Sequence, residues 1–132
     1  MQQVKLIALL TVLIFSMTPN VFAQTTNGWQ NQHTKVKGTW SIEQRADGNY
    51  VTLSDDFKTR NAPDLKIFLS KNNADSLTGS NATNNSVLVA KLSSSKGAQS
   101  YKIPENINVA DYESLLIHCE QYSKLWAATP LQ

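Results

Sequence analysis

The sequence predicts an all-β fold, a small antiparallel β-sandwich or barrel of about seven short strands. Three observations support this fold class. Apolar residues recur at every second position in several short runs, polar turn signals separate the runs, and no segment beyond the first 23 residues has the period of a long helix. Short alternating strands without helices between them indicate a fold in which strands pack on strands.

The first 23 residues predict a cleavable secretory signal. Lys5 supplies a positive charge, Leu6–Phe15 is a continuous apolar run, and Val21-Phe22-Ala23 places small residues at a signal-peptidase site. The apolar run is too short to span a membrane, so a retained anchor is the weaker alternative. We expect the exported chain to begin at Gln24 and residues 24–132 to form one β-domain. It would be periplasmic or secreted, without stable membrane insertion.

The first predicted strands form a hairpin. Polar residues dominate Gln24–Lys35, which we expect to be a loose leader or an edge strand. Apolar residues then alternate through Val36–Ile42. Asp47-Gly48 marks a tight turn, because glycine tolerates the positive φ that such turns need, and Tyr50–Leu53 is the return strand.

The rest of the chain contributes five further strands and two connections. The loop Lys71–Ser86 is rich in Asn, Ser and Thr, and we expect it to contribute nothing to a core. Asn108 can cap a single helical turn that ends at Asp111. The five predicted strands are Leu65–Leu69, Val87–Leu92, Ser100–Ile103, Leu115–Tyr122 and Leu125–Ala128.

The exported chain carries little net charge and one cysteine. Without Lys5 the formal net charge falls from +2 to +1, which gives no electrostatic reason to expect nucleic acid as a partner. The single thiol, Cys119, cannot form an internal disulfide, so packing alone must stabilise this small exported domain.

Cys119 and its neighbour His118 are the residues with the most chemical potential. Side chains alternate along a strand, so Cys119 shares the more apolar face with Ile117, and His118 faces the other way. Direct activation of the thiol by His118 therefore fails unless a bulge intervenes. A thiol that is buried in apolar surroundings is inert. Three roles stay open: a core residue, a redox or ligand-binding thiol, or an intermolecular disulfide.

Other polar and aromatic residues have structural interpretations. Two histidines and one cysteine without metal-binding spacing predict no metal site. Asp56 and Asp64 occupy turn positions, where carboxylates accept local hydrogen bonds. Trp40 falls on the apolar face of its strand and is expected in the core, whereas Trp29 lies in polar sequence and is expected to be an exposed contact.

Between Val36 and Leu131 the chain carries a set of short motifs in a fixed order. They are Asp56-Phe57, Ala62-Pro63-Asp64-Leu65, Ala90-Lys91-Leu92, Lys96-Gly97-Ala98-Gln99-Ser100-Tyr101, Ile103-Pro104, Asn106-Ile107-Asn108, Tyr112, Ser114, Ile117, Cys119, Tyr122, Trp126-Ala127 and Leu131. This ordered set resembles the DM-thirteen domain family, also called the electron-transfer DM domain.

The resemblance implies a small extracytoplasmic β-domain whose signature residue is a cysteine near the C-terminus, at Cys119 here. In the family this cysteine is proposed to act as a naked redox thiol or to hold a prosthetic group such as haem. The chain departs from the family pattern at His118, where Trp is usual, at Ala62, where Gly is typical, and at Asn108, where Asp is typical. The imidazole at the first of these positions could add a ligand.

The leading functional hypothesis is therefore an exported electron-transfer accessory domain rather than an enzyme. Cys119 is its candidate redox thiol, Cys119 and His118 are the candidates to hold a cofactor, and haem is implied by the resemblance alone. The expected partner is a separate redox protein or cytochrome. The alternative is a non-enzymatic binding module in which Cys119 belongs to the core and Trp29 or the Lys71–Ser86 loop makes the contacts.

Overall fold

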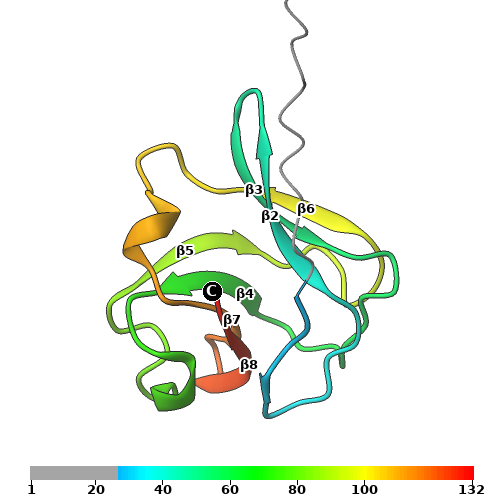
Figure 1. Cartoon of the computed structure of the whole chain (residues 1–132). Helices are drawn as coiled ribbons and strands as arrows, with labels where there is room; N and C mark the ends of the chain where they lie inside the picture. Colours follow the sequence, from blue (N-terminus) through cyan, green and yellow to red (C-terminus); the bar gives the residue numbers. More distant parts are fainter. Residues whose placement is uncertain (1–26) are drawn as a thin grey trace, which may run out of the picture.

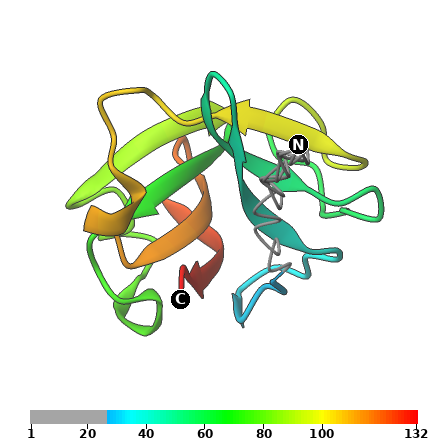
Figure 2. The ribbon, with the colours of Figure 1, turned by 45° about the horizontal axis from the view of Figure 1, so that its top comes forward.

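The computed structural model describes residues 27–132, which form two antiparallel β-sheets packed face to face. The predicted signal sequence and the start at Gln24 lie outside the described residues. One sheet has the strand order β1-β8-β7-β4-β5 and the other the order β2-β3-β6. Figures 1 and 2 show the two sheets on opposite sides of the molecule. The strands are β1 (Asn31–Gln32), β2 (Trp40–Arg45), β3 (Gly48–Leu53), β4 (Leu65–Ser70), β5 (Ser86–Lys91), β6 (Gln99–Lys102), β7 (Ser114–Cys119) and β8 (Lys124–Pro130).

This arrangement confirms the all-β prediction as an open sandwich. The described residues contain no helix beyond two 3₁₀ turns, η1 (Ala74–Ser76) and η2 (Val109–Asp111). Asn108 caps η2 as expected, since its side chain accepts a hydrogen bond from the Ala110 amide at 3.2 Å. No helix in this part of the chain is long and apolar enough to cross a membrane.

The predicted hairpin is confirmed as β2 and β3, but β2 begins at Trp40 rather than at Val36. Gly38 explains the later start, because its φ of +88° departs from strand geometry and a Cβ there would lie 2.8 Å from the Phe57 backbone. The turn itself comprises Ala46 and Asp47, one position earlier than predicted, and Gly48 follows with φ +140°.

The prediction of a strand over Leu115–Tyr122 was too long. β7 ends at Cys119, because the chain turns at once into β8: the Ser123 amide donates to the Glu120 carbonyl at 3.1 Å, and Ser123 has φ +47°. β8 carries a bulge at Trp126, since Ile117 pairs with Ala127 and His118 pairs with Leu125. Such an extra residue lets two successive side chains turn to the same face.

Two buried clusters lie on opposite faces of the five-stranded sheet. The first, here called the main core, lies between the sheets and consists of Trp29, Val36, Trp40, Val51, Leu53, Phe57, Leu65, Ile67, Leu69, Tyr101, Ile103, Leu115, Ile117, Cys119, Trp126 and Ala127. The second core lies on the outer face and consists of Phe68, Ala74, Leu77, Ala82, Leu116, Leu125 and Ala128. The bulge places Trp126 and Ala127 together in the main core.

The prediction that the loop Lys71–Ser86 contributes nothing to a core was wrong. Three of its residues, Ala74, Leu77 and Ala82, cover the outer face of β7 and β8. Its asparagines make this possible, because they satisfy the loop's own backbone. Asn73 accepts from the Asp75 amide at 2.9 Å, and Asn81 accepts from the Thr78 amide at 2.7 Å.

Trp29 is not the exposed contact that its polar neighbours predicted. It is 7% exposed and lies in the main core, 6.5 Å from Trp40 between ring centroids. Pairing of the short edge strand β1 with β8 holds this segment against the sandwich, and the amides of His33 and Thr34 both donate to the Trp126 carbonyl at 3.0 Å. Trp40 is in the core, as predicted.

Candidate functional site

Cys119 lies at the end of β7, at the position paired with Leu65 of β4 and Lys124 of β8. It is a free cysteine with 0% exposure, and its side chain belongs to the main core. The predicted inward orientation is therefore confirmed. Every other residue of the main core is aliphatic or aromatic, and none carries a carboxylate, an amine or an imidazole. The thiol therefore packs with the aliphatic and aromatic side chains of the main core.

His118 faces the other side of the sheet. It is paired with Lys66 and Leu125, is 2% exposed, and meets Phe68 edge-on with ring centroids 6.3 Å apart. Its Nδ1 is buried and has no hydrogen-bond partner among the described residues. Burial lowers the pKa of His118 below its ordinary value of 6.5, while the carboxylates of Glu120 and Asp64 oppose that shift. The lowered pKa favours the neutral form of the imidazole.

Cys119 and His118 are sequence neighbours, but the fold does not bring their side chains together. The bulge beside them belongs to β8 and leaves the alternation along β7 intact, so the thiol lies in the main core and the imidazole against the second core. A haem does not fit these residues. Its iron could not take both side chains as ligands, and it could not reach a fully buried sulfur without displacing core residues.

Asp56 makes a local hydrogen bond, as predicted, whereas the partner of Asp64 is 57 residues away, in the turn after β7. Asp64 accepts a hydrogen bond from the Gln121 amide at 3.0 Å, and Asp56 accepts one from the Ser54 hydroxyl at 2.6 Å. Among residues 27–132, no three His, Cys, Asp or Glu side chains are grouped so that they could hold a metal ion.

A surface feature that sequence reasoning missed is a group of five exposed cations. We call it the cationic strip; it consists of Lys35, Lys37, Lys58, Arg60 and Lys96. Four of these, with Thr59, line an open hollow of about 360 Å³. A net charge of +1 concealed this group, because a sum says nothing about how charges are distributed. The available signal was the spacing: in both Lys35-Val36-Lys37 and Lys58-Thr59-Arg60, two cations flank a buried residue.

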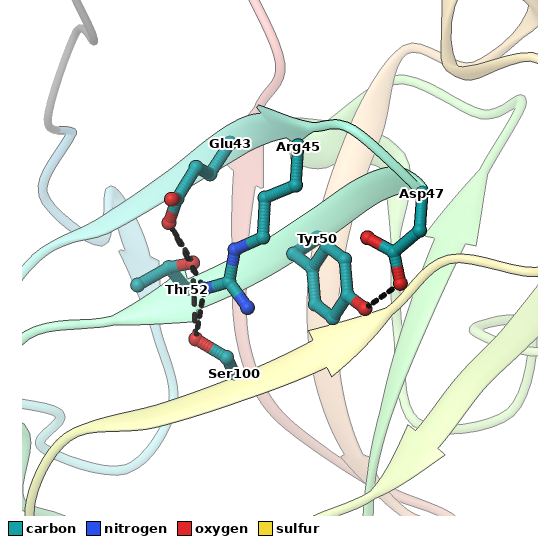
Figure 3. A network of polar contacts seen from close by, with 6 residues as sticks. All are labelled: Glu43, Arg45, Asp47, Tyr50, Thr52 and Ser100. Carbon is teal, nitrogen blue, oxygen red and sulfur yellow. Dashed lines mark hydrogen bonds and ion pairs between the residues drawn. The ribbon is translucent and has the colours of Figure 1, made fainter.

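The outer face of the three-stranded sheet shows the opposite pattern, a network of paired polar groups (Figure 3). Arg45 donates to Glu43 at 3.1 Å and to Ser100 at 3.0 Å, and its guanidinium lies 4.0 Å from the centroid of the Tyr50 ring. The hydrogen bond from Arg45 lowers the pKa of Glu43. Tyr50 in turn donates to Asp47 at 2.8 Å. The charged groups on this face are therefore paired with neighbouring groups of the same sheet.

Comparison with known families gives one match. The family model described as Electron transfer DM13 matches residues 28–131, which is almost all of the chain that the structure describes. Neither the curated proteins nor the solved structures contain a match to the chain.

Proposed function

This chain belongs to the Electron transfer DM13 family, and on that premise we propose that it is an exported accessory domain that serves a separate redox protein. The observation that carries the proposal is the extent of the family match, from residue 28 to residue 131, over both sheets and both cores. The match includes Cys119, the only thiol in the sequence.

Export is the first part of the proposal, and the pattern of residues 1–23 supports it. A positive start, a short apolar run and small residues at 21–23 are typical of a cleaved signal, which directs a protein to the periplasm or outside the cell. The intact mass of the protein recovered from the exporting cell should correspond to a chain that begins at Gln24. Recovery of the uncleaved chain in the membrane fraction would contradict export.

The role of Cys119 separates two candidate functions. As a naked redox thiol it would have to exchange an electron with a partner and release its proton, but its side chain is completely buried in the main core. A reactive cysteine needs an accessible sulfur, and the side chain of Cys119 has 0% exposure. Complete burial therefore favours the second candidate, in which Cys119 is a packing residue of the main core.

We infer that the domain contributes a binding surface to electron transfer and that the redox group belongs to its partner. In this view the protein resembles a binding module more than a redox carrier. The alternative in which Cys119 holds a prosthetic group predicts a different absorption spectrum, whereas the alternative of a naked redox thiol is tested by the reactivity of the thiol.

The experiment is an absorption spectrum of the protein purified from its native compartment, beside that of Cys119→Ala. We expect both proteins to show only the aromatic band. A visible band in the native protein that disappears in the variant would overturn the packing role, because it would show a chromophore held at Cys119. Far-UV circular dichroism of the variant serves as the control that the sheets are intact.

A further inference from the structure

We propose that the cationic strip is the surface on which this domain docks an acidic face of its partner redox protein. The inference rests on the proposed accessory function and names the surface that would perform it. Three properties of the strip carry it: its members lie on one face, their charges are uncompensated, and the backbone beneath them is fixed.

The strip is built on a short ladder of three segments. Lys58 pairs with Lys37 on one side and with Lys96 on the other. The backbones of Lys37 and Lys58 exchange two hydrogen bonds, of 2.8 and 3.3 Å. Residues directly opposite each other in an antiparallel ladder project their side chains to the same face. The side chains of these three lysines therefore project from the same face of the ladder.

This arrangement costs stability, because like charges directly opposite each other in a ladder repel. No carboxylate of the described residues forms an ion pair with the strip: the five ion pairs of residues 27–132 involve Arg45, Lys66 and Lys102 and no member of the strip. The outer face of the three-stranded sheet differs, because Arg45 is paired with Glu43 there and Lys102 with Asp47 and Glu105. Adjacent cations without ion pairs attract an external anionic surface, which would relieve their mutual repulsion.

The backbone beneath the strip is tied to the main core. Thr59, which lies between Lys58 and Arg60 and lines the hollow, is 8% exposed. Its hydroxyl oxygen accepts the indole N–H of Trp126 at 2.7 Å, and the hydroxyl donates to the Lys35 carbonyl at 3.2 Å. Thr59 therefore ties its own segment directly to the buried Trp126, and it ties the segment of Lys35 to the same tryptophan indirectly. A surface that is already ordered loses less conformational entropy when a partner binds.

The chemistry of the strip favours a protein partner over the other polyanions. A nucleic-acid site would be expected to add exposed aromatic side chains on which bases stack, and a membrane site would add apolar side chains that insert. The hollow has neither, since its lining residues are lysines, an arginine and a threonine. A charged surface can steer a complementary partner and bind it reversibly. This suits electron transfer, in which the interfaces between partners are small and the complexes short-lived.

The test uses a plant-type ferredoxin, an acidic [2Fe–2S] protein, as the probe. It measures the dissociation constant of the complex between this ferredoxin and the chain that begins at Gln24, at low ionic strength. Lys37→Gln/Lys58→Gln should weaken binding about tenfold, and added salt should weaken binding by the unaltered protein. The matched control is Lys71→Gln/Lys102→Gln, which removes the same charge outside the strip and should change the dissociation constant less than twofold.

Equal effects of the two double variants, or no binding of the ferredoxin, would overturn the docking surface. Tighter binding to phosphatidylserine vesicles or to single-stranded DNA than to the ferredoxin would also overturn it, since the strip would then serve another polyanion. These results are independent of the spectrum. A chromophore at Cys119 would contradict the packing role of Cys119 but would not change the result of the docking measurement. A failed docking measurement would contradict the docking surface but would not change the spectrum.

Discussion

The two faces of β7 are both buried, but different parts of the chain cover them. Over the face that carries Leu115 and Cys119 lies a complete three-stranded sheet with its own hydrogen-bonded ladder. The face that carries Leu116 and His118 is covered by a loop, which contributes two alanines and one leucine. The first cover is a regular layer, and the second is a short segment held by turn hydrogen bonds.

The difference decides where polar chemistry is tolerated. On the main-core face the sulfur of Cys119 is the most polar atom that β7 contributes, and it behaves there as a small apolar group. The other face accommodates an imidazole whose Nδ1 has no partner among the described residues. The thiol thus belongs to the face that a hydrogen-bonded sheet covers, and the titratable imidazole belongs to the face that a loop covers.

The largest expected change in stability comes from truncating one buried leucine on each face of β7. Leu115 and Leu116 are adjacent and both 0% exposed. We expect Leu115→Ala to lower the free energy of unfolding by about 4 kcal/mol, near the upper part of the range for buried leucines, because two sheets cannot close over the cavity. Leu116→Ala should cost about 2–3 kcal/mol, since a loop can collapse into the space. Urea denaturation measures both losses. If Leu116→Ala cost as much as Leu115→Ala or more, the sheet and the loop would not differ as covers of β7.

A second variant lifts the loop without touching β7. A Cβ on Gly79 would lie 2.2 Å from the Ser123 carbonyl oxygen, which belongs to the turn between β7 and β8. Gly79→Ala should therefore cost about 1–3 kcal/mol, in line with other overpacking changes. Amide hydrogen exchange should show faster exchange in the loop and unchanged protection in β2 and β3. The matched control is Gly28→Ala, where a Cβ meets nothing within 4 Å. A uniform loss of protection would show that the loop and the sheets unfold together.

Replacing the sulfur tests the main-core face directly. Cys119→Ser should lower the free energy of unfolding by about 1–3 kcal/mol, because a hydroxyl would be buried among the apolar side chains of the main core. Thermal denaturation beside the unaltered protein measures the loss. A serine variant as stable as the parent would indicate that the site is wetter than a packed core.

The smallest effect concerns the imidazole. Burial lowers the pKa of His118, so below its unfolded value of about 6.5 the unfolded chain binds a proton that the folded chain does not. Stability from this group is therefore complete above that pH and declines as the pH falls, by at most about 1.4 kcal/mol per unit. The charged groups near the ring are Lys66, which is paired with it, and Glu120 and Asp64, which moderate the decline.

His118→Phe should remove this component of the pH dependence, whereas substitution of the exposed His33 by Gln should preserve it. Urea midpoints measured between pH 5 and 8, the range in which histidine titrates, give the comparison. An unchanged slope in the phenylalanine variant would place the acid sensitivity elsewhere.

Sequence reasoning reached the sandwich and the inward direction of Cys119, because both follow from alternation along single strands. It missed what depends on contacts between distant segments. Trp29 lies in polar sequence, yet the pairing of β1 with β8 brings it into the main core. The loop over the second core is polar in composition, yet its asparagines satisfy the backbone and release three apolar side chains inward. The cationic strip needs three segments in register, which no local pattern reveals.

The central claim is that Cys119 is a closed packing residue and not the working thiol of the domain. The most direct test is the rate at which a thiol reagent modifies Cys119 at neutral pH, with and without denaturant. We expect the folded protein to react at least about a thousandfold more slowly than the unfolded chain, since the sulfur becomes accessible only when the sheets separate. Stoichiometric labelling of the folded protein at the unfolded rate would contradict the account and restore Cys119 as the candidate redox residue.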